Sequence, residues 1–194
     1  MKIILASQSP RRRQLLEQMG LEFTTQSPEI DEHAFHGRVA RDLVETLSRE
    51  KARWVARQAD PAALVIGADT VVVLDGAILG KPRNGAEAEA MLASLAGREH
   101  QVFTGVTLCQ GERVLTQSEE TWVTFRPLTS REIRQYVSTG EPMDKAGAYG
   151  IQGLGGLLVE GIRGDYHNVM GLPICRLGRM LLDFGVDCLA LAGR

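Results

Sequence analysis

The run of residues 64–74, Leu-Val-Ile-Gly-Ala-Asp-Thr-Val-Val-Val-Leu, constrains the fold more than any other stretch of the chain. Its length and its β-branched side chains predict a strand near the centre of a sheet. Asp75-Gly76 follows directly, and this pair favours a two-residue hairpin turn. Residues 77–79 should therefore return antiparallel and bring Lys81 back beside the strand, which predicts a mixed sheet.

Strand-like and helix-like segments alternate through the rest of the chain, which predicts the α/β fold class. The length suits one domain over residues 1–194, or one domain with two lobes. Further strands are expected over 3–6, over 102–108 as a half-buried strand, and over 114–124. Helices are expected after Pro10, over 43–55, before Gly97, over 133–137, and over 174–184 after Pro173.

Asp69 is the strongest catalytic candidate because it lies inside the apolar run. A buried carboxylate is costly unless it is paired, hydrated or bound to a metal. Functional groups usually lie at the carboxyl ends of parallel strands, so a bulge or a strand break is expected near Gly67. The alternative is a buried structural aspartate that caps a neighbouring loop.

Ser7-Gln8-Ser9-Pro10-Arg11-Arg12-Arg13 joins a helix start to three guanidinium groups. Ser9 suits the N-cap, Pro10 suits the first helical position, and Gly20 supplies a stop. A helix N-terminus carries partial positive charge, so arginines in the first turn are unfavourable unless an anion offsets them. The segment therefore predicts an anion site, and the alternative is a solvated basic turn.

Lys51 falls on the inward stripe of the helix expected over 43–55. Its ammonium either reaches past the stripe to solvent or projects into a cleft that holds an anion. Together with Arg11, Arg12 and Lys81, which the hairpin brings toward Asp69, it forms a plausible phosphate clamp.

Residues 147–156 are dense in glycine and contain Tyr149, Ile151 and Gln152. So many glycines indicate that the backbone approaches something closely, and tight packing of the loop explains them equally well.

Several classes of function are excluded by composition and spacing. The formal net charge is −2, so the global field needed for non-specific binding of nucleic acid is absent. The chain becomes polar after residue 6, so its first apolar stretch is too short for the core of a signal peptide. No later apolar run approaches the length of a membrane span, and we therefore expect a cytoplasmic protein. Scattered cysteines indicate reduced thiols: Cys109, Cys175 and Cys188.

Look-alike nucleotide and metal motifs fail on spacing. Residues 76–81 lack one residue of a phosphate-binding P-loop, and residues 153–158 lack the third glycine of a dinucleotide fingerprint. Asp31, His33 and His36 match no strong zinc spacing. A magnesium or manganese site that uses Asp69 and Glu32 is more credible, because these ions favour carboxylates and substrate phosphates.

The ordered set of these motifs resembles the Maf-like nucleotide pyrophosphatases over nearly the whole chain. The resemblance implies an elongated fold like that of the inosine triphosphate pyrophosphatases, with a cleft between two lobes. It also implies hydrolysis of nucleoside triphosphates to monophosphate and pyrophosphate, a divalent cation, and a homodimer. The motifs that carry it are residues 7–12, Glu32, Lys51, residues 67–70, residues 80–82, residues 144–153 and residues 164–173.

Within that family, the chain resembles the branch that acts on dTTP and UTP, because it carries Arg11, Thr70 and Gln152 at the three positions that separate the branches. A neutral amide such as Gln152 can both donate to and accept from the imide edge of thymine or uracil.

We also hypothesise roles for these residues in hydrolysis. We expect Asp69 to accept a proton from the attacking water and Glu32 to position metal or water. Phosphates would be held by Ser7, Arg12, Lys51 and Lys81. The alternative is a nucleotide-binding regulator of septum formation without essential catalysis, as suggested by the family's association with cell-division arrest.

Overall fold

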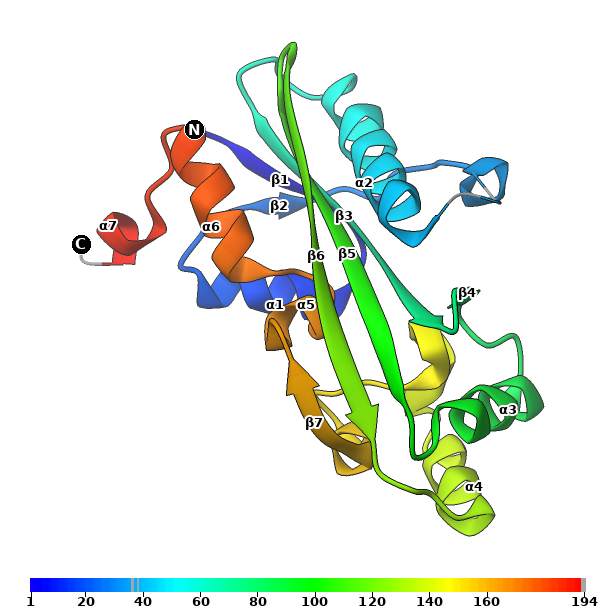
Figure 1. The fold of residues 1–194 in the computed structure, drawn as a ribbon. Helices are drawn as coiled ribbons and strands as arrows, with labels where there is room; N and C mark the ends of the chain where they lie inside the picture. Colours follow the sequence, from blue (N-terminus) through cyan, green and yellow to red (C-terminus); the bar gives the residue numbers. More distant parts are fainter. Residues whose placement is uncertain (36, 38, 193–194) are drawn as a thin grey trace. The chain divides into compact units, whose positions relative to one another are not determined.

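The computed structural model describes residues 1–35, 37 and 39–192 and confirms a mixed α/β fold. Its described strands form one seven-stranded sheet in the order β2-β1-β3-β5-β6-β7, with β4 paired to β3 (Figure 1). The strands are β1 Ile3–Ala6, β2 Thr24–Thr25, β3 Leu64–Leu74, β4 Ala77–Leu79, β5 Glu99–Gln110, β6 Arg113–Phe125 and β7 Val159–Arg163.

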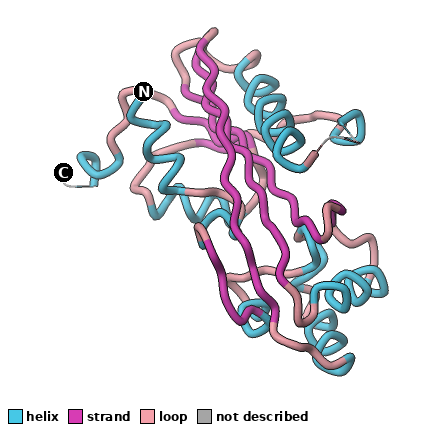
Figure 2. Tube along the Cα trace, in the orientation of Figure 1, coloured by secondary structure: helices cyan, strands magenta, loops and turns pink. Residues whose placement is uncertain are grey.

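The helices lie between these strands or, for the last three, after β7, and they are coloured cyan in Figure 2. The α-helices are α1 Pro10–Gln18, α2 Ala40–Ala56, α3 Gly85–Leu95, α4 Ser130–Ser138, α5 Tyr166–Met170, α6 Ile174–Asp183 and α7 Cys188–Ala192. Short 3-10 helices are η1 Glu32–Phe35, η2 Glu141–Asp144, η3 Ala146–Ala148 and η4 Leu154–Leu158. Among the described residues, no helix combines the length and the apolar character needed to cross a membrane.

The chain divides into two compact units. The first comprises Met1–Asp69, Thr104–Glu119 and Gly171–Arg194, and the second comprises Thr70–Phe103 and Glu120–Met170. The single domain over 1–194 and the cleft between lobes stay predictions.

The hairpin predicted after residue 74 is confirmed. Asp75 and Gly76 have φ angles of 50° and 79°, the left-handed conformations that a two-residue turn of this kind requires. β4 returns antiparallel to β3, with Val72 opposite Leu79. β1 pairs parallel to β3, so the sheet is mixed as expected.

The strand break predicted near Gly67 is wrong. β3 runs without interruption, and β1 pairs with it in regular register until Ala6 stands opposite Gly67. β1 ends there, so Asp69 lies two residues beyond the carboxyl end of its parallel neighbour. The functional position therefore arises from the end of β1, without a break in β3.

The half-buried strand predicted over 102–108 is also buried more fully than expected. Thr104 and Thr107 are as inaccessible as the apolar Val106. The hydroxyl of Thr107 lies 2.9 Å from the hydroxyls of both Ser48 and Thr116, which satisfies it in the interior. Alternation of residue type here reflects paired hydroxyls and not a solvated face.

In the first unit, α2 packs on one face of the parallel strands. Ile4, Ala6 and Val65 share a buried cluster with Ala52 and Val55 of α2. Side chains alternate along a strand, so Leu5 and Ile66 point to the opposite face, where Figure 1 draws α1 and α6.

Gly67 permits the close approach of α2. A Cβ atom at this position would lie 2.9 Å from both the Cβ and the backbone nitrogen of Ala52. Val65, Gly67 and Asp69 lie on the same face of β3, since their spacing is two residues. The glycine therefore lets α2 pack tightly at Ala52, so that the preceding residue, Lys51, can reach Asp69.

The second unit has its own core beneath α3 and α4. Leu92, Leu95, Ile133 and Phe125 are buried together there. α4 begins with a capping box, in which Thr129 and Glu132 satisfy each other's backbone N–H groups.

The start and the end of α1 agree with the prediction from the sequence. Ser9 is the N-cap of α1 and Pro10 opens the helix, while Gly20 has a φ of 72° just beyond its end. The short α7 was not expected, because five residues give too little periodicity to read.

Candidate active site

Asp69 and Lys51 form a buried ion pair in the first unit. The ammonium Nζ of Lys51 donates to Oδ1 of Asp69 across 2.5 Å, and the two side chains are 12% and 10% exposed. Asp69 is presented by β3 and Lys51 by the fourth turn of α2, whose close approach Gly67 permits. The Lys51 ammonium is therefore paired with a protein carboxylate and does not extend into solvent, and its role in holding a bound anion stays a prediction.

Glu32 contributes a second carboxylate to the same ammonium. Its Oε1 lies 2.7 Å from Nζ of Lys51, and its side chain is 56% exposed. Glu32 opens η1, the 3-10 helix that precedes α2. The Lys51 ammonium therefore pairs with two carboxylates, the exposed Glu32 and the buried Asp69, which are far apart in the sequence.

Arg12 is oriented by two acceptors in the first unit. Its Nε donates to the backbone carbonyl of Gly171 at 2.8 Å, and its Nη1 donates to the hydroxyl of Ser7 at 3.3 Å. The Ser7 hydroxyl also accepts the backbone N–H of Ser9 at 3.1 Å, so it fixes the entrance to α1. Arg13 instead forms an exposed pair with Glu17 one turn along.

Burial and charge act in opposite directions on Asp69. Removal from water raises the pKa of its carboxyl, while Lys51 and then Arg12 oppose the increase. Burial likewise lowers the pKa of Arg12, and the charge of Asp69 works against that decrease. Asp69 thus combines a raised proton affinity with two cationic neighbours, which suits a group that must accept a proton beside an anion.

The structure brings together five of the residues predicted from the sequence: Ser7, Arg12, Glu32, Lys51 and Asp69. Arg11 lies partly buried in the first turn of α1, within the same unit. The other three belong to the second unit: Thr70 follows Asp69 on β3, Lys81 is exposed after β4, and Gln152 is exposed in the glycine-rich loop. Their participation stays a prediction.

The carbonyl of Gly171 is a functional contact that sequence reasoning missed. The segment 164–173 is one of the motifs that carry the family resemblance, but the sequence assigned no role to it. A backbone acceptor leaves no signature in residue type, so only the folded chain reveals that Gly171 orients Arg12.

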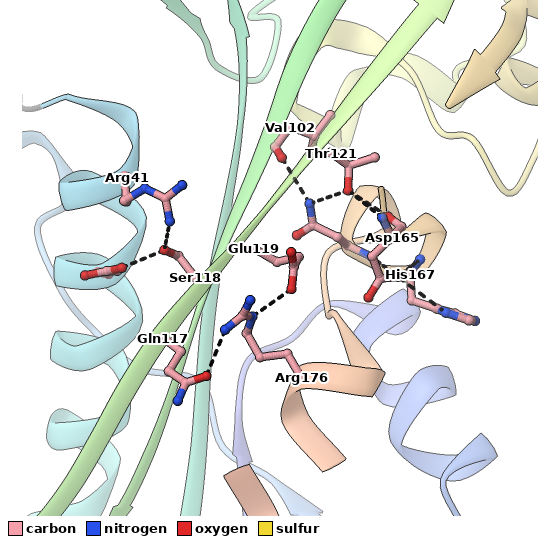
Figure 3. A network of polar contacts seen from close by, with 11 residues as sticks. Arg41, Val102, Gln117, Ser118, Glu119, Thr121, Asp165, His167 and Arg176 are labelled. Carbon is pink, nitrogen blue, oxygen red and sulfur yellow. Dashed lines mark hydrogen bonds and ion pairs between the residues drawn. The ribbon is translucent and has the colours of Figure 1, made fainter. Parts of the chain in front are cut away.

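Asp165 in that segment is structural. Its Oδ1 accepts the backbone N–H groups of His167 at 2.7 Å and Asn168 at 3.2 Å, which caps α5 (Figure 3). Thr121 donates its hydroxyl to the backbone carbonyl of Asp165 at 2.9 Å. The contacts of Asp165 therefore stabilise the second unit, whereas Gly171 is the residue of this segment that contacts Arg12.

A separate network secures β6 within the first unit. Ser118 donates to Glu45 and accepts from Arg41, while Arg176 of α6 donates to Glu119 and to Gln117 (Figure 3). These contacts join α2 and α6 to β6, and none of them involves Asp69.

Asp69 and Glu32 fit a hard divalent cation. Both are carboxylates, and both already face one positive group, the Lys51 ammonium. Across the described part of the chain, no cluster of three or more His, Cys, Asp or Glu side chains could hold a metal alone. Two protein carboxylates with substrate phosphates and water is the usual arrangement for magnesium.

The zinc hypothesis falls on His36 and on the side chain of His33, which lie outside the described part of the structure. Cys109, Cys175 and Cys188 are all free thiols, as predicted.

Comparisons with known proteins find similar sequences over nearly the whole length of this chain. A family model described as Maf-like protein matches residues 2–184. A dTTP/UTP pyrophosphatase of Symbiobacterium thermophilum is 55% identical over 184 residues, covering 95% of this chain and 94% of that protein. A dTTP/UTP pyrophosphatase of Moorella thermoacetica is 53% identical over 189 residues, covering 96% of each.

Among solved structures, a dITP/XTP pyrophosphatase of Mycobacterium abscessus aligns with 66% of this chain and 76% of its own, at 18% identity and a TM-score of 0.42.

Proposed function

Because this chain belongs to the Maf-like protein family, we propose that it is a nucleoside triphosphate pyrophosphatase that releases pyrophosphate from dTTP and UTP. The observation that carries the proposal is the grouping of Asp69 with Lys51 and Arg12. A buried carboxylate beside two cations suits removal of a proton next to a highly charged phosphate chain.

Asp69 is the proton acceptor in this scheme. A water molecule attacks the α-phosphorus, the bond from that phosphorus to the oxygen bridging the β-phosphate breaks, and pyrophosphate leaves with that oxygen. The water gives its proton to the Asp69 carboxylate as its oxygen bonds to phosphorus. The products are the nucleoside monophosphate and pyrophosphate.

The cations of the site neutralise the charge that develops on the phosphates. Arg12, which Ser7 and Gly171 orient, would hold phosphate oxygens with its planar guanidinium. Lys51 supplies a compact charge beside Asp69, and Lys81 is the further cation proposed from the sequence.

Asp69 and Glu32 are the residues that would hold a magnesium or manganese ion. When bound, such an ion neutralises phosphate oxygens and lowers the pKa of a bound water.

Base selection falls to Arg11, Thr70 and Gln152. The Gln152 amide can donate to a carbonyl of the imide edge and accept its N–H, which fits both thymine and uracil. We expect the protein to act in the cytoplasm, as a homodimer, on nucleotides and not on nucleic acid.

The variant Asp69→Asn tests the proposal. Asn keeps the shape of the side chain but cannot accept the proton, so pyrophosphate release from dTTP should fall by about 10²- to 10⁴-fold while the protein stays folded and binds nucleotide. Asp75→Asn, at the exposed hairpin turn, is the matched control and should keep its activity.

Near-normal turnover by the Asp69→Asn protein would remove Asp69 from its role. Wild-type activity confined to purine triphosphates would overturn the assignment to pyrimidines. Cell-division arrest that persists in Asp69→Asn would separate nucleotide binding from hydrolysis and favour the regulator alternative.

A further inference from the structure

Two side chains of the second unit fasten both ends of the loop that carries Gln152. The backbone N–H of Gly150 donates to the hydroxyl of Tyr136 at 3.1 Å. At the other end, the N–H groups of Leu154 and Gly155 donate to the two carboxylate oxygens of Glu141 at 2.9 and 3.0 Å. Gln152 stands midway between these attachment points.

Tyr136 and Glu141 also bind each other, which joins the two ends of the loop. The Tyr136 hydroxyl donates to Oε1 of Glu141 across 2.8 Å. Tyr136 is only 6% exposed and belongs to α4, and Glu141 opens η2 directly after it. We call this pair and its three backbone contacts the Tyr136–Glu141 clamp.

The glycines of the loop make room for the clamp. A Cβ atom on Gly153 would lie 2.7 Å from Cδ of Glu141, and one on Gly155 would lie 2.6 Å from the Tyr136 hydroxyl. A Cβ on Gly150 would lie 2.6 Å from Cε of Lys145, whose ammonium donates to the backbone carbonyl of Glu141. Of the two explanations for the glycine density, the described structure supports tight packing, against these side chains.

The Glu141 carboxylate is ionised at neutral pH. Partial burial raises its pKa, but the hydrogen bonds from Gly155, Leu154 and Tyr136 outweigh this, so the pKa lies below its usual value. An ionised carboxylate that accepts three hydrogen bonds holds the loop more firmly than a neutral group would.

We infer that Tyr136 and Glu141 are positioning residues for base selection, because their clamp fixes the loop that presents the Gln152 amide to an imide-containing pyrimidine. This inference rests on the proposed function. A Gln amide recognises uracil by pairing donor and acceptor in one orientation, and a loop free to shift would let it meet cytosine equally well. Fixing the loop in advance also removes its ordering cost from binding.

The experiment compares kcat/KM for UTP and CTP in folded variants. Gln152→Ala gives the UTP:CTP ratio expected when the amide no longer contributes to base selection. Tyr136→Phe and Glu141→Gln should each lower the UTP:CTP ratio about fivefold, as expected for one or two lost hydrogen bonds, through KM for UTP with kcat little changed. In the Gln152→Ala background, Glu141→Gln should have no further effect on the ratio.

Matched controls separate positioning from general destabilisation. Tyr149→Phe removes another buried hydroxyl, bonded to His100 at 2.8 Å, one residue before the loop but outside the clamp. Glu160→Gln removes an exposed carboxylate on β7. Both should keep the UTP:CTP ratio of the wild type.

Hydrogen exchange gives a readout independent of activity. Amides of Gly150, Leu154 and Gly155 should exchange at least about tenfold faster in Glu141→Gln, while amides in α3 keep their rates.

Unchanged ratios and exchange rates in both clamp variants, with the ratio lowered in Gln152→Ala, would overturn the inference while leaving the proposed function intact. An equal loss of kcat for UTP and CTP would overturn it as well. Failure of the wild type to release pyrophosphate from either nucleotide would refute the proposed function itself, and the positioning role with it.

Discussion

The ammonium of Lys51 lies 2.5 Å from the carboxylate of Asp69, and both side chains are almost excluded from solvent. Two opposite charges in the interior are costly to desolvate, so such a pair is weak evidence for stability. Its value here is chemical: Lys51 keeps a buried carboxylate ionisable, and burial keeps the proton affinity of that carboxylate high. Several consequences can be measured.

The first concerns the pH dependence of the wild type. The pKa of Asp69 is raised by burial, and the reaction needs its ionised form. Activity should therefore fall on the acid side with an apparent pKa above the value of about 3.9 that is usual for aspartate. The measurement is kcat/KM for dTTP against pH at fixed magnesium concentration, and an acid limb at or below pH 3.9 would contradict the prediction.

Lys51→Met should move this acid limb to higher pH. Removal of the ammonium takes away the main group that opposes the rise in the pKa of Asp69, so a larger fraction of the carboxyl is protonated at a given pH. Arg53→Met, on the exposed part of the same helix, should leave the limb in place. A limb that stays put in Lys51→Met would show that the pair has no electrostatic role in the reaction.

Local features of the fold were predictable from the sequence because local rules dictate them. The ends of β3 and the turn at Asp75 follow from residue type alone, as does the start of α1 at Pro10. The charge conflicts at Lys51 and Asp69 were also visible, since each places a charged group on an apolar stripe. Their pairing was not, because nothing in the sequence specifies that α2 lies against β3 at Gly67.

The parts that escaped prediction depend on contacts made by the backbone or on distant partners. The carbonyl of Gly171 that orients Arg12 could come from any residue type. Glu141 carries no motif of its own, although the glycines it packs against were conspicuous. The end of β1 opposite Gly67 likewise depends on how two strands pair and not on either strand alone.

Arg12→Lys should lower kcat/KM by about 10- to 100-fold. A lysine cannot bond Gly171 and Ser7 together and still offer a forked pair of donors to phosphate, and charged hydrogen bonds contribute about 1.5–3 kcal/mol each. Arg13→Lys is the matched control, because Arg13 is exposed and its pair with Glu17 contributes little. Steady-state kinetics of both variants with dTTP decide the point, and equal effects at the two arginines would refute the assignment.

The last prediction concerns stability and the buried His100. The residue is 1% exposed, its Nε2 lies 2.8 Å from the Tyr149 hydroxyl, and its buried Nδ1 has no hydrogen-bond partner among the described residues. The ring also makes edge contacts with the uncharged rings of Phe125 and Tyr149. Burial accordingly lowers the pKa of His100 from 6.5 to about 4.

The sign follows from proton uptake. Between pH 6.5 and 4 the unfolded chain binds a proton at His100 that the folded protein does not, so the free energy of unfolding decreases as pH falls through this window. From pH 6.5 to 5 the loss should be about 2 kcal/mol from this residue, and above pH 6.5 it should vanish. Urea unfolding at pH 7 and pH 5 measures the difference.

His100→Gln provides the comparison, because it keeps a polar group near Tyr149 and removes the titration. Between pH 7 and pH 5 the free energy of unfolding should decrease less in this variant than in the wild type. The difference between the two decreases should be about 2 kcal/mol, whatever the substitution costs at neutral pH. Other titrating groups contribute equally to both proteins and cancel in the difference. Parallel losses in the two proteins would mean that His100 is protonated in the folded state, and that the core of the second unit admits the charge.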